Sequence, residues 1–167
     1  MDSTLRISGI IEESIVDGEG IRFVVFVQGC PHHCDGCHNP DTHDFSGGES
    51  ASIGDLFERI CENPLLRGVT FSGGEPFCQS GPLAALAALV HERGLDVTTY
   101  TGFTLEALQS RGDPAVNALL DATDVLIDGP FVLAQRDLSL RFRGSANQRV
   151  IDMNATRRTG TLTLATL

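Results

Sequence analysis

No stretch of this 167-residue chain is apolar enough to cross a membrane. The longest apolar run covers residues 83–90, well short of the roughly 18–20 residues that a bilayer requires, and its alanines suit a packed helix. The first residues also lack the basic segment followed by an apolar one that a secretory signal peptide shows. We therefore expect a cytoplasmic protein with no membrane partner.

Clustered basic residues are scarce as well. The chain carries 12 Lys and Arg residues against 22 Asp and Glu residues, for a formal net charge of −10. Proteins that bind nucleic acids need patches of Lys and Arg to neutralise phosphates. The composition therefore disfavours DNA or RNA as a partner, and it is ordinary for an acidic soluble enzyme.

The cysteines make a poor disulfide framework. There are five of them, an odd number, and three lie within eight residues, at positions 30, 34 and 37. In a reducing compartment such a cluster indicates a metal site. Of the other two, we expect Cys61 to be buried on a helix beside Phe57, and Cys78 needs no ligand role.

The chain is too short for a complete eight-unit (β/α) barrel, which takes about 250 residues. β-Branched and aromatic runs alternate with helical patterns, the order that builds βα units around a parallel sheet. The sequence predicts an α/β fold: a partial, open (β/α) barrel with a mostly parallel sheet of about five to six βα units, in a single domain over residues 1–167. We expect strands near residues 5–11, 21–27, 68–72, 95–100, 124–128, 149–152 and 161–164, and helices near residues 52–61, 80–93, after 104 and over 114–122.

The three clustered cysteines have the spacing C-x3-C-x2-C. This spacing would also place them on one face of a helix, but Gly29, Pro31 and Gly36 indicate a loop. Three thiolates are one short of a closed tetrahedral site or of a fully ligated iron–sulfur cube, which leaves a coordination position open for chemistry. Zinc is the alternative, with a fourth ligand from His32, His33 or His38.

A second motif, Gly73-Gly74-Glu75-Pro76, follows a short predicted strand. Glycines at a strand end let a ligand approach the backbone closely, and ligands gather at the carboxyl ends of parallel strands. Glu75 is then placed to meet a positively charged group. Alone, the motif is equally an ordinary Gly-Gly turn, and its weight comes from the cysteine triplet.

Together the two motifs resemble those of the radical S-adenosylmethionine enzymes. Within them, the chain looks like the small activases of glycyl-radical enzymes, and most like those of the anaerobic (class III) ribonucleotide reductase. The stretches that carry the resemblance span most of the chain in matching order: residues 14–22, 29–40, 70–77, 100–103, 124–131 and 143–152.

The resemblance implies a [4Fe–4S] cluster held by Cys30, Cys34 and Cys37, with S-adenosylmethionine on the iron that lacks a cysteine. In the family, an electron from the cluster cleaves the sulfonium and yields a 5′-deoxyadenosyl radical, which takes a hydrogen atom from a glycine of the partner. The implied partners are the glycyl-radical subunit of an anaerobic ribonucleoside-triphosphate reductase and a flavodoxin or ferredoxin-type electron donor.

The resemblance also assigns cofactor contacts. Gly73, Gly74 and Glu75 match the motif that holds the methionine end of S-adenosylmethionine, with Glu75 near its ammonium group. Many members have an aromatic residue before the third cysteine, near the adenine, whereas this chain has Gly36. The adenine contacts must then come from elsewhere, with His38 as one candidate.

Further candidates lie in loops and at strand ends. Asp17 matches an Asp-Gly loop that lies near the substrate's glycine in these activases, although Asp-Gly pairs also form plain turns. Thr101 and Asp128 end strands on the ligand side of the sheet, where Asp128 either accepts from ribose hydroxyls or caps a turn. Arg143 and Asn147 are candidates for the ligand carboxylate or a partner surface, with solvated side chains as the alternative.

Other functions stay open at this point. They are an activase of the pyruvate formate-lyase type, a radical S-adenosylmethionine enzyme acting on a small molecule, such as the deazaguanine-forming step, and a zinc or iron–sulfur module without catalysis. A small substrate profits from a closed pocket, whereas a protein loop needs the wide entrance that a truncated barrel provides. The short chain therefore favours a macromolecular substrate.

Overall fold

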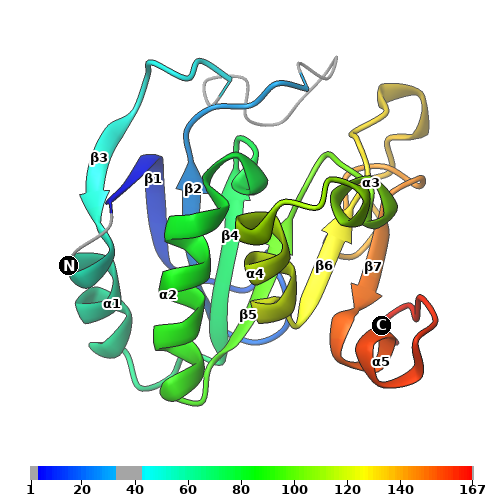
Figure 1. Ribbon diagram of the computed structural model, residues 1–167. Helices are drawn as coiled ribbons and strands as arrows, with labels where there is room; N and C mark the ends of the chain where they lie inside the picture. The colour runs from blue at the N-terminus through cyan, green and yellow to red at the C-terminus, as the bar shows by residue number, and fades with distance from the viewer. Residues whose placement is uncertain (1–3, 33–42, 167) are drawn as a thin grey trace.

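One seven-stranded sheet runs through the computed structural model, which describes residues 4–32 and 43–166 (Figure 1). Its strands are β1 (Thr4–Ser14), β2 (Arg22–Val27), β3 (Glu49–Ser52), β4 (Gly68–Gly73), β5 (Asp96–Tyr100), β6 (Val125–Asp128) and β7 (Arg149–Asp152). They lie in the order β3-β1-β2-β4-β5-β6-β7. The neighbours from β2 to β6 pair in parallel, whereas β1, β3 and β7 join through antiparallel pairings.

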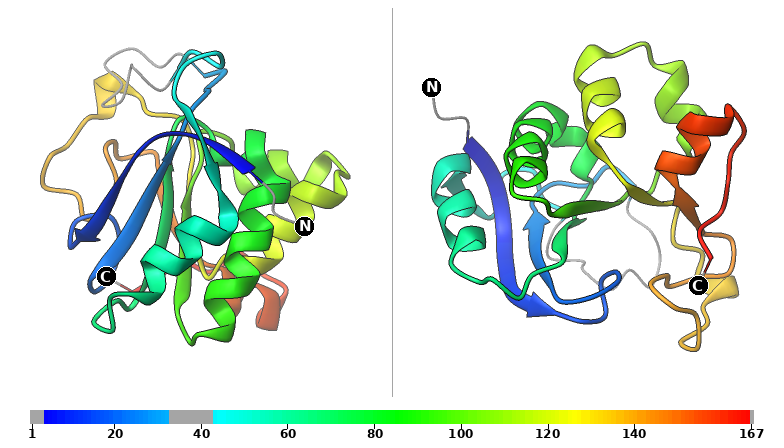
Figure 2. Two further views of the ribbon diagram at one scale, coloured as in Figure 1. Left: turned by 90° about the vertical axis from the view of Figure 1, so that its left-hand side faces the viewer. Right: turned by 90° about the horizontal axis from the view of Figure 1, so that it is seen from below.

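Helices cover one face of this sheet (Figure 2). They are α1 (Ile53–Cys61), α2 (Ser80–Glu92), α3 (Leu105–Ser110), α4 (Pro114–Ala122) and α5 (Met153–Thr159), with short 3-10 turns η2 (Pro76–Gln79) and η3 (Leu133–Gln135). We call the opposite face of the sheet the inner face. Among the described helices, none is long and apolar enough to cross a membrane.

Local sequence explains where the helices begin. The hydroxyls of Ser52 and Thr104 accept from the amides of Asp55 and Ala107, and the carboxylate of Asp113 accepts from the amide of Ala115. These caps satisfy amides that have no partner within the helix. The predicted starts of α1, α3 and α4 are therefore confirmed.

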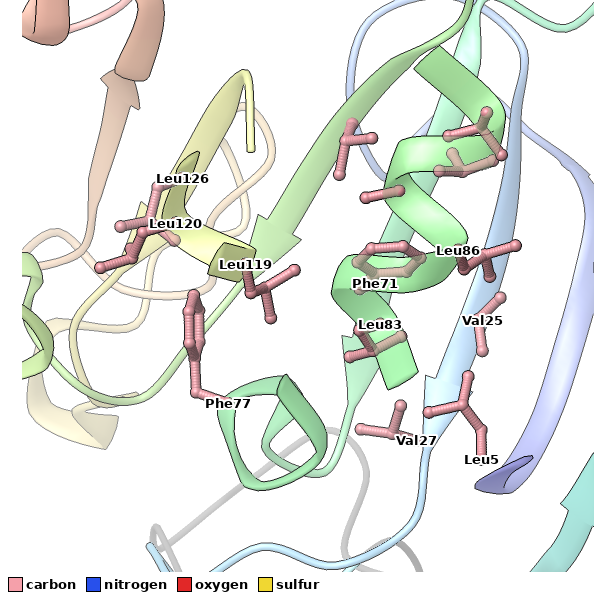
Figure 3. Close-up of a cluster of buried hydrophobic side chains, with 14 of the residues drawn as sticks. Leu5, Val25, Val27, Phe71, Phe77, Leu83, Leu86, Leu119, Leu120 and Leu126 are labelled. Atoms are coloured by element: carbon pink, nitrogen blue, oxygen red, sulfur yellow. The ribbon is translucent and has the colours of Figure 1, made fainter. Parts of the chain in front are cut away.

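The core lies between the sheet and the helices. Phe71 on β4 and Val25 on β2 are fully buried and face Leu83 and Leu86 of α2 (Figure 3). Because side chains alternate along a strand, Thr70 points from β4 to the inner face. By the same alternation the inner face carries both polar and apolar side chains, with Arg22 and Thr98 beside Val125 and Ile127.

The predicted α/β fold with an open, partial barrel is confirmed, and the outer strands refine it. The parallel run has four strands rather than five to six βα units in succession. Residues 129–148 connect β6 to β7 with only the 3-10 turn η3, so β7 returns antiparallel. The predicted strand at 161–164 is wrong: in this segment only Leu164 makes a bridge, to Ile151.

Candidate active site

A cleft opens where the parallel strands β2, β4 and β5 end. Its cavity volume is about 130 Å³. Cys30 and His32 line it from the loop after β2, residues 72–74 from β4 and residues 100–102 from β5. The segment between β6 and β7 closes another side with Gly129, Phe131 and Gln148. Cys30 of the cysteine motif and Gly73 and Gly74 of the second motif therefore share one cleft.

Backbone hydrogen bonds hold the first cysteine of the motif near the ends of β2 and β4. Cys30 is only 7% exposed, and its amide donates to the carbonyl of His43 at 3.2 Å. The carbonyl of the preceding Gly29 accepts from the amide of Glu75 at 2.7 Å. The cysteine loop thus leaves β2 already attached to β4. Cys34, Cys37 and His38 lie outside the described residues.

Gly73 and Gly74 bring the two strand ends together. Gly73 has φ of +94°, a backbone conformation that side chains disfavour. A Cβ on Gly74 would lie 2.3 Å from the carbonyl oxygen of Gly29. The close approach seen here is thus between chain segments, and contact with S-adenosylmethionine stays a prediction for both glycines.

Glu75 is completely buried, and its carboxylate forms hydrogen bonds with several residues that line the cleft. Oε2 accepts from the Phe77 amide at 3.0 Å and from the Thr101 hydroxyl at 2.9 Å. Oε1 accepts from the Gly102 amide at 2.8 Å and pairs with Nε2 of His32 at 2.6 Å. A carboxylate has about four acceptor positions, and all are used. An approaching ammonium group would have to share or displace one of these donors.

His32 connects the cysteine loop to the Glu75 carboxylate. Its side chain is 16% exposed, and its ring packs edge-on against Phe103 with 4.5 Å between centroids. A Cβ on Gly102 would come within 2.4 Å of the imidazole, so only glycine fits there. The sequence offered His32 only as a possible zinc ligand. Its contact with Glu75, 43 positions away, could not be read from the loop.

The two predicted strand-end residues have different surroundings. Thr101 lines the cleft and donates to Glu75. Asp128 is 1% exposed, accepts from the Leu105 amide at 2.8 Å and pairs with Arg149, whose Nε lies 2.9 Å from Oδ1. The bond to Asp128 and a second one to Glu106 raise the pKa of Arg149 above its ordinary value. Asp128 therefore braces α3 and β7, and it does not line the cleft.

The three predicted substrate-loop residues lie on two segments. The Asp17 carboxylate accepts from the Ser14 hydroxyl at 2.6 Å in the loop between β1 and β2. Arg143 donates to the Gln148 carbonyl at 3.0 Å, and Asn147 donates to the Pro130 carbonyl at 2.8 Å. The last two bonds fold the β6–β7 segment onto itself. Contact with a substrate stays a prediction for all three residues.

The remaining cysteines do not add a ligand to the cleft lining. Cys61, expected to be buried, is half-buried at the end of α1. Cys78 is exposed; desolvation of its thiol, followed by the neighbouring Glu75 and Cys30, raises its pKa to about 11. A thiol with so high a pKa is protonated at neutral pH, and metals bind the thiolate.

The donor set fits an iron–sulfur cluster. Three cysteines in a C-x3-C-x2-C loop offer three thiolates, and the first of them is buried and lines the cleft. Fold and site together define an α/β iron–sulfur protein with an open half-barrel. In agreement, residues 16–151 match the family described as a 4Fe-4S single cluster domain, which favours iron–sulfur over zinc.

Comparison with known proteins identifies a family within this class of iron–sulfur proteins. The anaerobic ribonucleoside-triphosphate reductase-activating protein of Vibrio cholerae is 38% identical over 146 residues, which cover 80% of this chain and 89% of that protein. The chain belongs to the family of these activating proteins. The pyruvate formate-lyase-activating enzyme of Clostridium pasteurianum is 41% identical over 95 residues, 54% of this chain and 40% of that enzyme.

A solved structure supports the fold. The crystal structure of QueE from Escherichia coli matches 75% of this chain and 70% of its own, with a TM-score of 0.50 and 17% sequence identity. At this identity the likeness concerns the fold alone. It agrees with the open α/β sheet described above.

Proposed function

We propose that this protein activates an anaerobic ribonucleoside-triphosphate reductase by generating a glycyl radical on it. The observation that carries the proposal is the shared cleft, in which Cys30 lies with Gly73 and Gly74 at the carboxyl ends of parallel strands, while the buried Glu75 donates its amide to the Gly29 carbonyl. Family membership supports it, because relatives from Vibrio cholerae and Haemophilus influenzae are named as activating proteins of this reductase.

Each part of the cleft has a task in this function. Cys30, Cys34 and Cys37 would hold a [4Fe–4S] cluster, and the open coordination position would take S-adenosylmethionine. When bound, these groups supply the electron and the 5′-deoxyadenosyl radical that removes a hydrogen atom from the partner's glycine. The chain's own residues orient the loop through Glu75 and line the cleft with Thr101.

The open side of the half-barrel suits a protein substrate. The described helices leave the inner face uncovered, and the β1–β2 loop, the β6–β7 segment and the C-terminal residues border it (Figure 2). A glycine carried on a partner's loop can enter from this side. Asp17, Arg143 and Asn147 lie on these bordering segments and are our candidates for contact with that loop.

The electron donor we propose is a flavodoxin or a ferredoxin-type protein. The chain needs a one-electron reductant for its cluster, and the family uses donors of this type. The net charge of −10 speaks against a nucleic acid as a further partner.

The test is an anaerobic reconstitution with iron and sulfide, followed by reduction and addition of S-adenosylmethionine. We expect 5′-deoxyadenosine, and a glycyl radical in electron paramagnetic resonance once the reductase is added. Absence of 5′-deoxyadenosine, or a colourless protein with one bound zinc, would contradict the proposal. A radical formed on pyruvate formate-lyase instead of the reductase would move the assignment to the second type of activase, the one met in Clostridium pasteurianum.

Matched cysteine variants sharpen this test. Cys30→Ala removes a proposed ligand and should abolish 5′-deoxyadenosine formation, because the cluster loses one of three anchors. Cys61→Ala changes a half-buried cysteine at the end of α1 and should leave the yield within about twofold, as expected for a site outside the machinery. Equal loss in both variants would show a general folding defect.

A further inference from the structure

A buried arginine lies beneath the inner face, away from the cysteine cleft. Arg22 opens β2 and is only 1% exposed. Its guanidinium donates to the Val69 carbonyl at 2.7 Å and to the Glu19 carbonyl at 2.9 Å, and it pairs with Asp96 at 2.5 Å. One side chain thus joins three strands to the loop between β1 and β2. A buried charge persists only when it is paired and bonded in this way.

Thr70 extends this network to a second residue of the loop. Its hydroxyl accepts from Nε of Arg22 at 2.7 Å and donates to the carbonyl of Asp17 at 2.8 Å. Thr70 is completely buried, so no water competes for either bond. The loop backbone is therefore held on both sides of Gly18, at Asp17 through Thr70 and at Glu19 through Arg22.

Gly18 packs closely against Arg22. It has φ of +135°, and a Cβ there would lie 2.7 Å from Cδ of Arg22, so a larger residue does not fit at this point of the loop. The outer side of the loop is free by contrast, because Ile15 and Val16 are 75% and 70% exposed. The inner side of this loop is fixed to the sheet, and its outer side presents apolar side chains.

The loop also lies near the cleft. Thr70, which holds the Asp17 carbonyl, shares one face of β4 with Ser72 two residues further along, and Ser72 lines the cleft. The backbone of Asp17 is therefore bonded to the strand face that leads into the cleft.

We propose that Arg22 and Thr70 are positioning residues that fix the loop of residues 15–20 as a docking edge for the partner's glycine segment. The proposal rests on the proposed function and deepens it. The network touches the loop and not the cysteine cleft, so it governs how the glycine is presented and not how S-adenosylmethionine is cleaved. Hydrogen transfer depends steeply on geometry, and a shift of about 1 Å can cost a hundredfold in rate.

The test uses three threonine variants of the reconstituted protein. Thr70→Val removes the hydroxyl, Thr70→Ser keeps it, and Thr99→Val makes the same change at a fully buried threonine of β5 that bonds Thr123 on the helix-covered side. The first readout is glycyl radical formed per 5′-deoxyadenosine. The second is hydrogen exchange of the peptide covering residues 15–21, measured without the partner.

We expect Thr70→Val to lower the radical yield per 5′-deoxyadenosine by about tenfold or more, while 5′-deoxyadenosine formed without the partner stays at the wild-type level. Exchange in residues 15–21 should rise about tenfold, because the loop loses a bond that fixes it. Thr70→Ser should restore both values, and Thr99→Val should change neither.

Two results would overturn the proposal. One is a Thr70→Val protein with wild-type coupling and wild-type exchange. The other is an equal effect of Thr70→Val and Thr99→Val, which would make Thr70 an ordinary buried residue. Failure of the proposed function is recognised separately, because wild-type protein would then form no glycyl radical, while the exchange measurement still decides whether the loop is fixed.

Discussion

At the scale of single residues, His32 is the side chain that connects the cysteine loop to the rest of the site. It lies two positions after Cys30 and reaches Glu75 at 2.6 Å, while Thr101 and two backbone amides hold the same carboxylate from other directions. Residues that orient the ligands of a metal site contribute substantially to metal affinity. We therefore predict that His32 positions the cysteine loop for the cluster.

We expect His32→Ala to weaken retention of the cluster by about 10–100-fold, the usual cost of losing such a partner. The measurement is iron released to a chelator over time, together with iron and sulfide per chain after reconstitution. The control is His91→Ala, which removes another imidazole–carboxylate contact, to Asp124 at 2.9 Å, at the opposite end of the sheet. Equal iron release from both variants and wild type would refute the role.

At the scale of elements, Asp124 ties α2, β5 and α5 together just before β6. Its carboxylate accepts from His91, from the Val97 amide at 2.8 Å and from Asn154 at 3.0 Å. Burial alone would raise the pKa of Asp124, but the hydrogen bonds from Asn154, His91 and Val97 outweigh it and hold the pKa below its ordinary value. The carboxylate therefore stabilises the fold in its charged form.

The sign of the pH dependence follows. A group whose pKa is lowered by folding contributes its full stability above its ordinary pKa of about 4 and loses it as pH falls through the folded value. We expect Asp124→Asn to lower Tm at pH 7 by about 2–4 °C, the effect of losing about 1 kcal/mol in a chain of this size. The difference from wild type should shrink below about pH 4 in cluster-free protein. A difference that is constant from pH 3 to 7 would contradict this.

Elements with strong local patterns could be predicted, and those without them could not. The capped helix starts at Ser52 and Thr104 and the strand of residues 68–73 agree with expectation. β3 was missed because Glu49–Ser52 is a polar edge strand with no apolar alternation. α5 was missed because it has only seven residues, three of them the poor helix formers Asn154, Thr156 and Thr159, and it relies on the Asp152 cap and the left-handed Gly160 at its ends.

At the scale of the whole molecule, only those parts of the site could be predicted that consist of residues close together in the sequence. The cysteine spacing and the Gly73-Gly74-Glu75 turn are local motifs, so their chemistry could be read directly. The bonds of His32 to Glu75 and of Arg22 to Thr70 join residues 43 and 48 positions apart. Such pairs depend on which strands become neighbours in the sheet, and no local pattern encodes that.

The single domain predicted for residues 1–167 has a direct consequence for unfolding. One hydrophobic cluster extends from Leu5 on β1 to Met153 on α5, and one sheet connects all seven strands. Secondary structure and the surroundings of Tyr100 should therefore be lost together. Tyr100 is the chain's one tyrosine, and there is no tryptophan, so tyrosine fluorescence reports on β5 alone.

We expect urea unfolding of cluster-free, reduced protein to give the same midpoint by circular dichroism and by Tyr100 fluorescence, as two-state behaviour requires. The cluster is left out because a bound cofactor breaks this behaviour. Tyr100→Phe should abolish the fluorescence change and keep the circular dichroism transition. Two separated midpoints would mean that the strands on either side of β5 unfold as independent units, and the chain would then contain more than one domain.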